Sequence, residues 1–280
     1  MPLPMLTASG VPTPEGYWGP PTSSVDWCEA NYAHSHGIAE LFNTLSSGSM
    51  VLAGVLGLLL HRRVLERRFS LCFASLVLVG LGSIAFHATL RFELQMADEL
   101  PMLYTAIVML FILLENQPQR RFGLWLPLAL AAHAALVTGL TAFTRGPLQF
   151  YLFHTSFGSM EAFSLYGVYR LQRAQPMSPT RNLFRAGIAA YLVAIVLWFI
   201  DLTRCPWLSG LSALGLFNPQ LHAVWHVLVS CGFYCLLLVV AYHRLVRLGQ
   251  HPQLVRALGL PRVESARVES TRVEGARLVR

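Results

Sequence analysis

The sequence has no lysine, and charged residues of every kind are scarce. All 21 basic residues are arginine, which we interpret as a consequence of base composition rather than of function. Only 12% of the 280 residues are charged and 54% are hydrophobic, whereas soluble proteins average about 25% charged residues and about 45–50% apolar ones. The composition therefore favours a membrane protein.

The chain also lacks closely spaced cysteines and a recognisable secretory signal peptide. Its five cysteines include no Cys-x-x-Cys pair, which argues against a structural zinc site built from thiolates. The first ten residues have neither a basic region nor an adequate apolar core. We therefore expect the first spanning helix to direct membrane insertion.

Seven apolar segments follow the amino-terminal region, and each is about 20 residues long, enough to cross a bilayer as a helix. They lie at roughly 38–60, 69–90, 95–115, 122–143, 147–170, 184–204 and 220–246. The sequence therefore predicts an all-α polytopic membrane protein, a bundle of seven transmembrane helices.

Arginine is concentrated at alternate connections between these segments. One side of the membrane would carry Arg62, Arg63, Arg67, Arg68, Arg120, Arg121, Arg170, Arg173, Arg181, Arg244 and Arg247. The other side would carry only Arg91, Arg145 and Arg204, because residues 1–36 contain no arginine. Positive charge favours cytoplasmic loops, so we expect a lumenal or extracellular amino terminus and a cytoplasmic carboxyl terminus. The same distribution argues against nucleic acid as a partner.

This topology divides the chain into three parts. Residues 1–37 form a lumenal segment and residues 38–247 form the membrane domain. Residues 248–280 form a cytoplasmic tail in which Arg-Val-Glu recurs every five residues from Arg262. A five-residue step gathers no single helical face, so we expect the tail to be disordered.

Three histidines and a serine recur at helical spacing inside the membrane segments. Ser83 and His87 are four residues apart, as are His222 and His226, so each pair shares a helical face. The topology puts all four in the lumenal half of the membrane, where polar side chains are costly unless they have a function. A single histidine is often only a packed core residue, and we interpret His133, His154 and His243, which have no such partners, as structural or interfacial. Three at one depth indicate a catalytic zinc site, which takes three protein ligands and water.

Acidic residues lie near the same depth. Asp98 and Glu99 are adjacent, so a helix points them about 100° apart and only one can face the metal. Glu99 would line the same cavity or cap the helix, and we interpret Asp201 as an acid solvated at the interface. Four residues within fifteen positions also offer side-chain oxygens of the kind calcium binds: Asp26, Glu29, Asn31 and Glu40. Acids in such a loop are usually only solvated, so spacing alone leaves calcium binding open.

Two cysteines fall on the lumenal side of this topology. Cys28 and Cys205 would meet an oxidising compartment, whereas Cys72, Cys231 and Cys235 lie within helices. We therefore expect a disulfide between Cys28 and Cys205, with two free thiols as the alternative.

At these residues the sequence closely resembles the alkaline ceramidases, membrane hydrolases related to the adiponectin-receptor-like proteins. The stretches that carry the likeness are residues 16–32, 38–44, 82–90, 95–102 and 220–226, for example Gly-Ser-Ile-Ala-Phe-His-Ala-Thr-Leu and Gln-Leu-His-Ala-Val-Trp-His. With the spacing between them, the resemblance covers about residues 16–247. The pentad tail has no counterpart in it.

The resemblance implies a hydrolase that cleaves ceramide into sphingosine and a fatty acid, in the endoplasmic reticulum or Golgi membrane. Ceramide and membrane lipids would be its partners, with no obligate protein partner evident. The resemblance places zinc on His87, His222 and His226, with Ser83 and Asp98 beside it as catalytic residues. It also places calcium on Asp26, Glu29, Asn31, Glu40 and the backbone carbonyl of Trp27.

Two other functions are compatible with membrane helices that carry these residues, a receptor and a transporter. A seven-helix receptor of the adiponectin-receptor type would use zinc structurally, and we expect such a receptor to place its amino terminus in the cytoplasm. A transporter that uses the buried acids would be expected to show repeats or broken helices, and neither is evident. Within the hydrolase, Ser83 is expected to stabilise an oxyanion, and the alternative is a nucleophilic serine.

Overall fold

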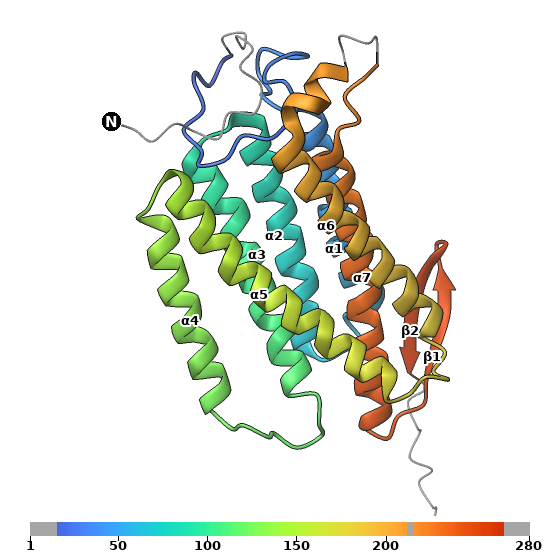
Figure 1. Ribbon diagram of the computed structural model, residues 1–280. Coiled ribbons are helices and arrows are strands. Elements are labelled where there is room, and N and C mark those ends of the chain that lie inside the picture. The colour runs from blue at the N-terminus through green and yellow to red at the C-terminus, as the bar shows by residue number, and fades with distance from the viewer. Residues whose placement is uncertain (1–15, 212–215, 266–280) are drawn as a thin grey trace, which may run out of the picture.

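The computed structural model describes residues 16–211 and 216–265, which form a bundle of helices with one small hairpin (Figure 1). The helices are α1 (Leu41–His61), α2 (Arg67–Thr89), α3 (Phe92–Leu114), α4 (Trp125–Ala142), α5 (Gly146–Arg173), α6 (Arg181–Gly210) and α7 (Leu221–Arg247). The strands are β1 (Pro252–Ala257) and β2 (Leu260–Ser265). The first fifteen residues and most of the pentad repeats lie outside this description.

Six helices of the described chain are long and apolar enough to cross a membrane, which confirms the prediction of a polytopic membrane protein. The exception is α5, which carries Gln149, His154 and Glu161 along its length. The exact count of seven spans therefore stays a prediction.

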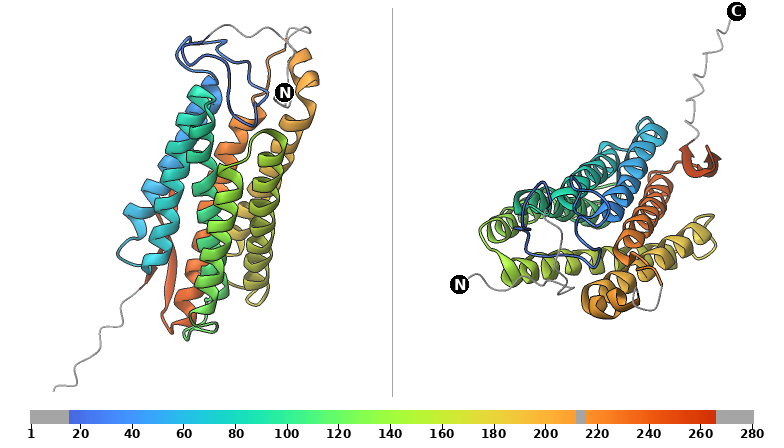
Figure 2. Two further views of the ribbon diagram at one scale, coloured as in Figure 1. Left: turned by 90° about the vertical axis from the view of Figure 1, so that its left-hand side faces the viewer. Right: turned by 90° about the horizontal axis from the view of Figure 1, so that it is seen from above.

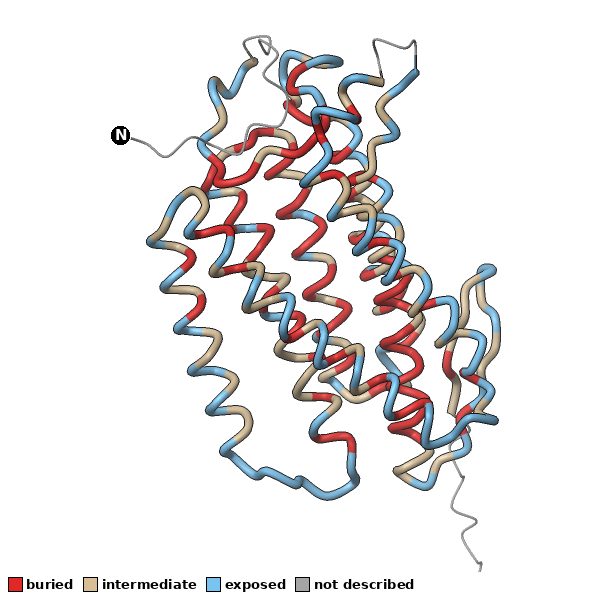
Figure 3. The backbone as a smooth tube through the Cα atoms, viewed as in Figure 1, coloured by how far each residue is buried: buried red, intermediate tan, exposed pale blue. Residues whose placement is uncertain are grey.

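The helices lie side by side, and α7 is the most enclosed of them (Figures 2 and 3). It packs against α1 and α6, while α1 packs along α2. The main core joins these helices through fully buried side chains such as Phe69, Phe73, Leu237 and Leu238. In contrast, α4 packs mainly against its neighbours α3 and α5, and among its described residues Val137 and Thr141 are the buried ones. The tightly packed half of the bundle is thus the half that contains α2 and α7.

An irregular loop, residues 16–40, covers one end of the bundle (Figure 1). It is held to the end of α2 by backbone hydrogen bonds. The amides of Thr22 and Ser23 donate to the carbonyl of Leu90, and the amide of Glu40 donates to the carbonyl of His87. Leu90 can accept them because it ends α2 in the left-handed conformation, with φ of 52°. The loop is therefore fixed directly above the carboxyl end of α2.

The prediction of a disordered tail is wrong for the start of that segment, and the fold is not strictly all-α. Strands β1 and β2 pair antiparallel about a turn at Leu258 and Gly259, both with positive φ. Val263 is completely buried beside the bundle, and its amide donates to Nε2 of His61 at 3.2 Å. The tail thus finds apolar and hydrogen-bonding partners on the helices, which its own five-residue period does not reveal.

Candidate functional site

Three buried histidines from two helices meet beneath the amino-terminal loop. His87 lies near the carboxyl end of α2, and His222 and His226 occupy successive turns at the amino end of α7. Each is at most 3% exposed. One ring nitrogen from each lies within 4.8 Å of the other two. The four-residue spacing on α7 therefore brings both rings to one face, as a helix requires.

Hydrogen bonds orient two of these rings. The Glu40 carboxylate is 2.5 Å from Nδ1 of His87, and the Ser46 hydroxyl is 2.8 Å from Nδ1 of His226. Both rings thus keep Nε2 for the cluster. Nδ1 of His222 is buried and has no hydrogen-bond partner among the described residues, while its ring stacks on Trp27 with centroids 3.7 Å apart.

This donor set fits a metal ion. A buried polar atom without a partner costs about 1–3 kcal/mol, and coordination would remove that cost at His222. Neutral imidazole is a common ligand of zinc and other transition metals. A carboxylate bonded to the second nitrogen of a ligating histidine, as at Glu40 and His87, is the usual support of such a ligand. The three histidines can therefore hold a metal ion.

Ser83 and Asp98 lie beside the histidines where α2 touches α3. Gly82 permits this approach, because a Cβ there would collide with the α3 backbone. The Ser83 hydroxyl is 2.9 Å from the hydroxyl of Ser47 and 3.4 Å from Nε2 of His226, and it also neighbours Asp98. Within the part of the chain that the structure describes, Oδ1 of Asp98 is buried without a hydrogen-bond partner. The site thus holds an unused carboxylate oxygen next to a hydroxyl.

An apolar cavity of about 340 Å³ adjoins this cluster. His222, Asp98 and Glu99 lie on its wall, together with Glu161 deeper in the bundle. Its apolar lining includes Val25, Met102, Phe157, Ile195, Trp198, Trp225, Val229 and Phe233. His154, which we interpreted as structural or interfacial, also lines it. The cavity can therefore take an apolar chain whose polar end reaches His222 and Asp98.

Glu99 lines this cavity and also joins two helices. It accepts hydrogen bonds from the side-chain amides of Gln95 at 2.8 Å and Gln149 at 2.5 Å. The first comes from its own helix α3 and the second from α5. Glu99 is therefore fully engaged, in contrast to its neighbour Asp98.

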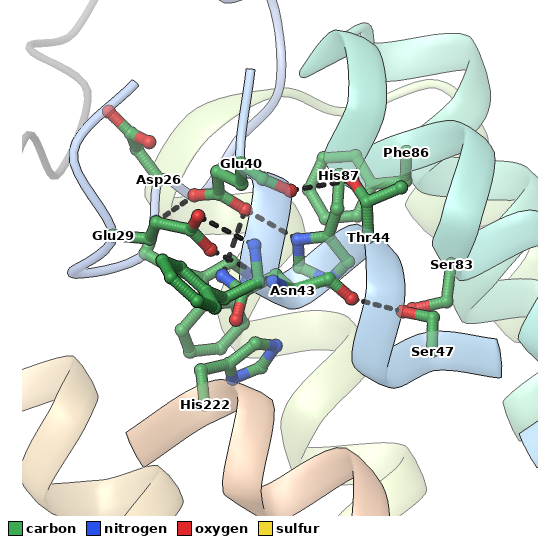
Figure 4. Close-up of polar contacts among 12 residues, drawn as sticks. Asp26, Glu29, Glu40, Asn43, Thr44, Ser47, Ser83, Phe86, His87 and His222 are labelled. Carbon is green, nitrogen blue, oxygen red and sulfur yellow. Dashed lines mark hydrogen bonds and ion pairs between the residues drawn. The ribbon is translucent and has the colours of Figure 1, made fainter. Parts of the chain in front are cut away.

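The residues implied for calcium lie in the loop above the histidines, and Figure 4 shows Glu29 and Glu40 side by side next to His87. The side-chain amide of Asn31 donates to both carboxylate oxygens of Asp26 at 3.1 Å. Oδ1 of Asn31 is buried without a partner. Glu40 accepts from the Trp27 amide at 3.3 Å through its other oxygen. Glu40 therefore connects this loop to the histidine cluster.

The carboxyls of this loop hold protons more tightly than free ones. Burial raises the pKa of Asp26 to about 7, and the charge of Glu40 adds to the rise. Burial also raises the pKa of Glu29 to about 7 and that of Glu40 to about 8. Clustered acids with an unpartnered amide oxygen form a donor set that suits a hard cation such as calcium.

Sequence reasoning missed three contributors to this region: Ser46, the ring of Trp27, and Asp201. The interpretation of Asp201 as solvated is wrong, because it is 2% exposed. The loop covers it, and it accepts the backbone amides of Cys28 and His222. Those partners are 173 and 21 residues away, so no local pattern could have revealed them.

The structure contains the disulfide expected between Cys28 and Cys205. It joins the amino-terminal loop to α6 just after a kink, since Arg204 has non-helical dihedrals and Pro206 lacks an amide hydrogen. Cys72, Cys231 and Cys235 are free.

Similarity to known proteins extends over most of the chain. Residues 19–263 match the family model described as Ceramidase. The chain is 31% identical over 255 residues to alkaline ceramidase 3 of Mus musculus, covering 88% of this chain and 93% of that relative. It is 30% identical over 245 residues to an alkaline ceramidase of Arabidopsis thaliana, covering 87% and 92%. It is also 28% identical over 259 residues to alkaline ceramidase YPC1 of Saccharomyces cerevisiae, covering 83% and 80%. The chain therefore belongs to the ceramidase family.

Proposed function

We propose that this protein is a zinc-dependent intramembrane amidase that hydrolyses ceramide to sphingosine and a fatty acid. The observation that carries the proposal is the buried trio of His87, His222 and His226, of which His222 lines an apolar cavity. The names of its relatives supply the substrate, and the cavity suits a lipid with one polar end. Access from the bilayer explains why such a hydrolase would lie within membrane helices.

An amide is a poor electrophile and water is a poor nucleophile, so the site must improve both. Zinc on the three histidines would supply the Lewis acid that activates water and polarises the carbonyl. Zinc fits better than calcium or magnesium here, because those ions prefer oxygen ligands.

Asp98 acts in this proposal as the general base and acid. Its unpartnered Oδ1 accepts the proton of the attacking water and returns it to the departing amine of sphingosine. Ser83 donates a hydrogen bond to the oxyanion that develops on the carbonyl. A serine nucleophile would need a histidine as its base, and the nearby histidines serve as metal ligands.

We further propose that the loop binds calcium through Asp26, Glu29, Asn31, Glu40 and the Trp27 carbonyl. Calcium would stabilise the ionised form of carboxyls whose pKa is raised by burial and would fix the loop over the cavity mouth. It would supply no chemistry of its own.

The proposed setting is the endoplasmic reticulum or Golgi membrane, crossed seven times, with the amino terminus in the lumen. The arginine-rich connections support this orientation. The disulfide supports it as well, because Cys28 and Cys205 then face an oxidising compartment.

Two variants test the proposed chemistry when metal content and ceramide turnover are measured together. His222→Ala should lose zinc and activity at once. Asp98→Ala should keep zinc and lose turnover by about 10²-fold or more. An Asp98→Ala enzyme with full activity would overturn the assigned base, and zinc retained in full by His222→Ala would overturn the assigned ligand.

A further inference from the structure

Asp201 lies where three separate parts of the chain meet. It sits on α6, almost completely buried. One carboxylate oxygen accepts the amide of Cys28 at 3.1 Å, and the other accepts the amide of His222 at 3.3 Å. One side chain thus joins α6, the amino-terminal loop and the first turn of α7.

The bond to His222 matters because the residue before α7 makes no side-chain capping bond. The first amides of a helix have no partners within it. The preceding residue, Gln220, is in the left-handed conformation and offers no side-chain cap. Asp201 therefore supplies from another helix the acceptor oxygen that a cap residue would normally provide. A negative charge at this helix end is also favourable.

The bond to Cys28 fixes the segment of the amino-terminal loop that packs against the ring of His222. Cys28 is fixed through its disulfide to Cys205, and its carbonyl accepts the side-chain amide of Asn218 at 2.9 Å. The residue before it, Trp27, stacks its ring on His222. His222 is thus held at its backbone by Asp201 and at its ring by the loop that Asp201 also holds.

We infer that Asp201 is a positioning residue that sets the place of His222 in the metal cluster. It contacts the backbone of His222 rather than a ring nitrogen, so it acts through the orientation of the first turn of α7. The inference rests on the proposed metal site. It goes further by assigning a role to an acid that neither binds the metal nor touches the reacting atoms.

The test compares Asp201→Asn and Asp201→Leu with Thr203→Ala as a matched control. Thr203 lies on the same helix, is exposed, and its hydroxyl donates to the carbonyl of Phe199. Zinc affinity is measured by competition with a chelator, and the ligand geometry is read from the visible absorption of the Co²⁺ form. We expect both Asp201 variants to bind zinc about 10–100-fold more weakly, as loss of outer-shell support usually does, and to change the Co²⁺ spectrum. Thr203→Ala should match the parent protein.

Melting temperatures with and without zinc separate positioning from simple stabilisation. Positioning predicts a smaller zinc-induced rise in the Asp201 variants. If the Asp201 variants lower the melting temperature equally with and without zinc, and leave the zinc affinity and the Co²⁺ spectrum unchanged, the inference is overturned. If neither variant folds, Asn218→Ala decides: weakened zinc binding supports the role of this junction, and unchanged binding refutes it. A parent protein that binds no zinc would instead refute the proposed function.

Discussion

At the scale of single residues, Glu40 is the side chain that the two candidate ion sites share. One of its oxygens accepts the Trp27 amide, and the other contacts Nδ1 of His87 and the side-chain amide of Asn43. It is completely buried. A substitution at Glu40 should therefore alter both the conformation of the loop and the position of the His87 ring.

Replacing Glu40 by Ala should weaken zinc binding by roughly 10–100-fold, because His87 loses the partner that fixes its ring. It should also reduce the dependence of ceramide turnover on calcium, since one carboxylate ligand is gone. Zinc titration and turnover at graded free calcium measure the two effects. Glu93→Ala, an exposed acid in the first turn of α3, is the control. If removing calcium from the parent protein leaves turnover unchanged, the calcium proposal fails.

Ser83 offers a separate prediction at the same scale. Ser83→Ala should lower kcat by about 10²–10³-fold, the usual cost of losing one oxyanion donor, and should leave zinc content unchanged. Ser47→Ala removes only the hydroxyl that contacts Ser83 and should have a smaller effect. Steady-state kinetics with metal analysis makes the comparison. An acylated Ser83 trapped during turnover would contradict this role and support a serine nucleophile.

At the scale of helices and strands, the sequence predicted what depends on periodicity and failed where long-range packing decides. Apolar length identified the helices, and the four-residue spacing of His222 and His226 identified one face of α7. The depth of His87 followed from the alternation of arginine-rich connections. In contrast, the roles of Ser46 and Asp201 depend on partners that only the folded bundle brings near.

The hairpin of β1 and β2 is a second element that the sequence failed to predict, because its stability depends on packing against the helices. The Arg-Val-Glu period gathers no helical face, but alternate residues of a strand do share a face. Val263 can therefore be buried while its neighbours remain accessible, and the Tyr234 hydroxyl donates to the carbonyl of Pro261 at 2.9 Å. The five-residue period of the tail predicted disorder because it carries no information about the surface of α1 and α7, on which β2 packs.

Val263→Asp should detach this hairpin. Burying an unpaired charge at a fully enclosed position should reduce stability by about 3 kcal/mol and expose the tail to proteases. Leu258→Asp at the hairpin tip, where the side chain is 85% exposed, should have little effect. Thermal unfolding and limited proteolysis measure both. Equal protease resistance in the two variants would show that the hairpin does not need its contact with the bundle.

At the scale of the whole molecule, the disulfide and the covering loop lie at one end of the bundle, and the hairpin lies beside α7 towards the other (Figure 1). The proposed orientation puts the first end in the lumen. A glycosylation acceptor added before residue 16 should therefore be modified, and one added after residue 265 should not. The reverse pattern would contradict the orientation and favour the adiponectin-receptor type of protein.

We propose that this molecule cleaves ceramide at a metal site inside the membrane. The most direct measurement incubates the purified protein with a panel of ceramides in H₂¹⁸O and follows the products by mass spectrometry. We predict equal amounts of sphingoid base and fatty acid, with one ¹⁸O in each fatty acid, and no release after zinc is removed or in His222→Ala. A folded, zinc-loaded protein that releases no sphingoid base from any ceramide would contradict it.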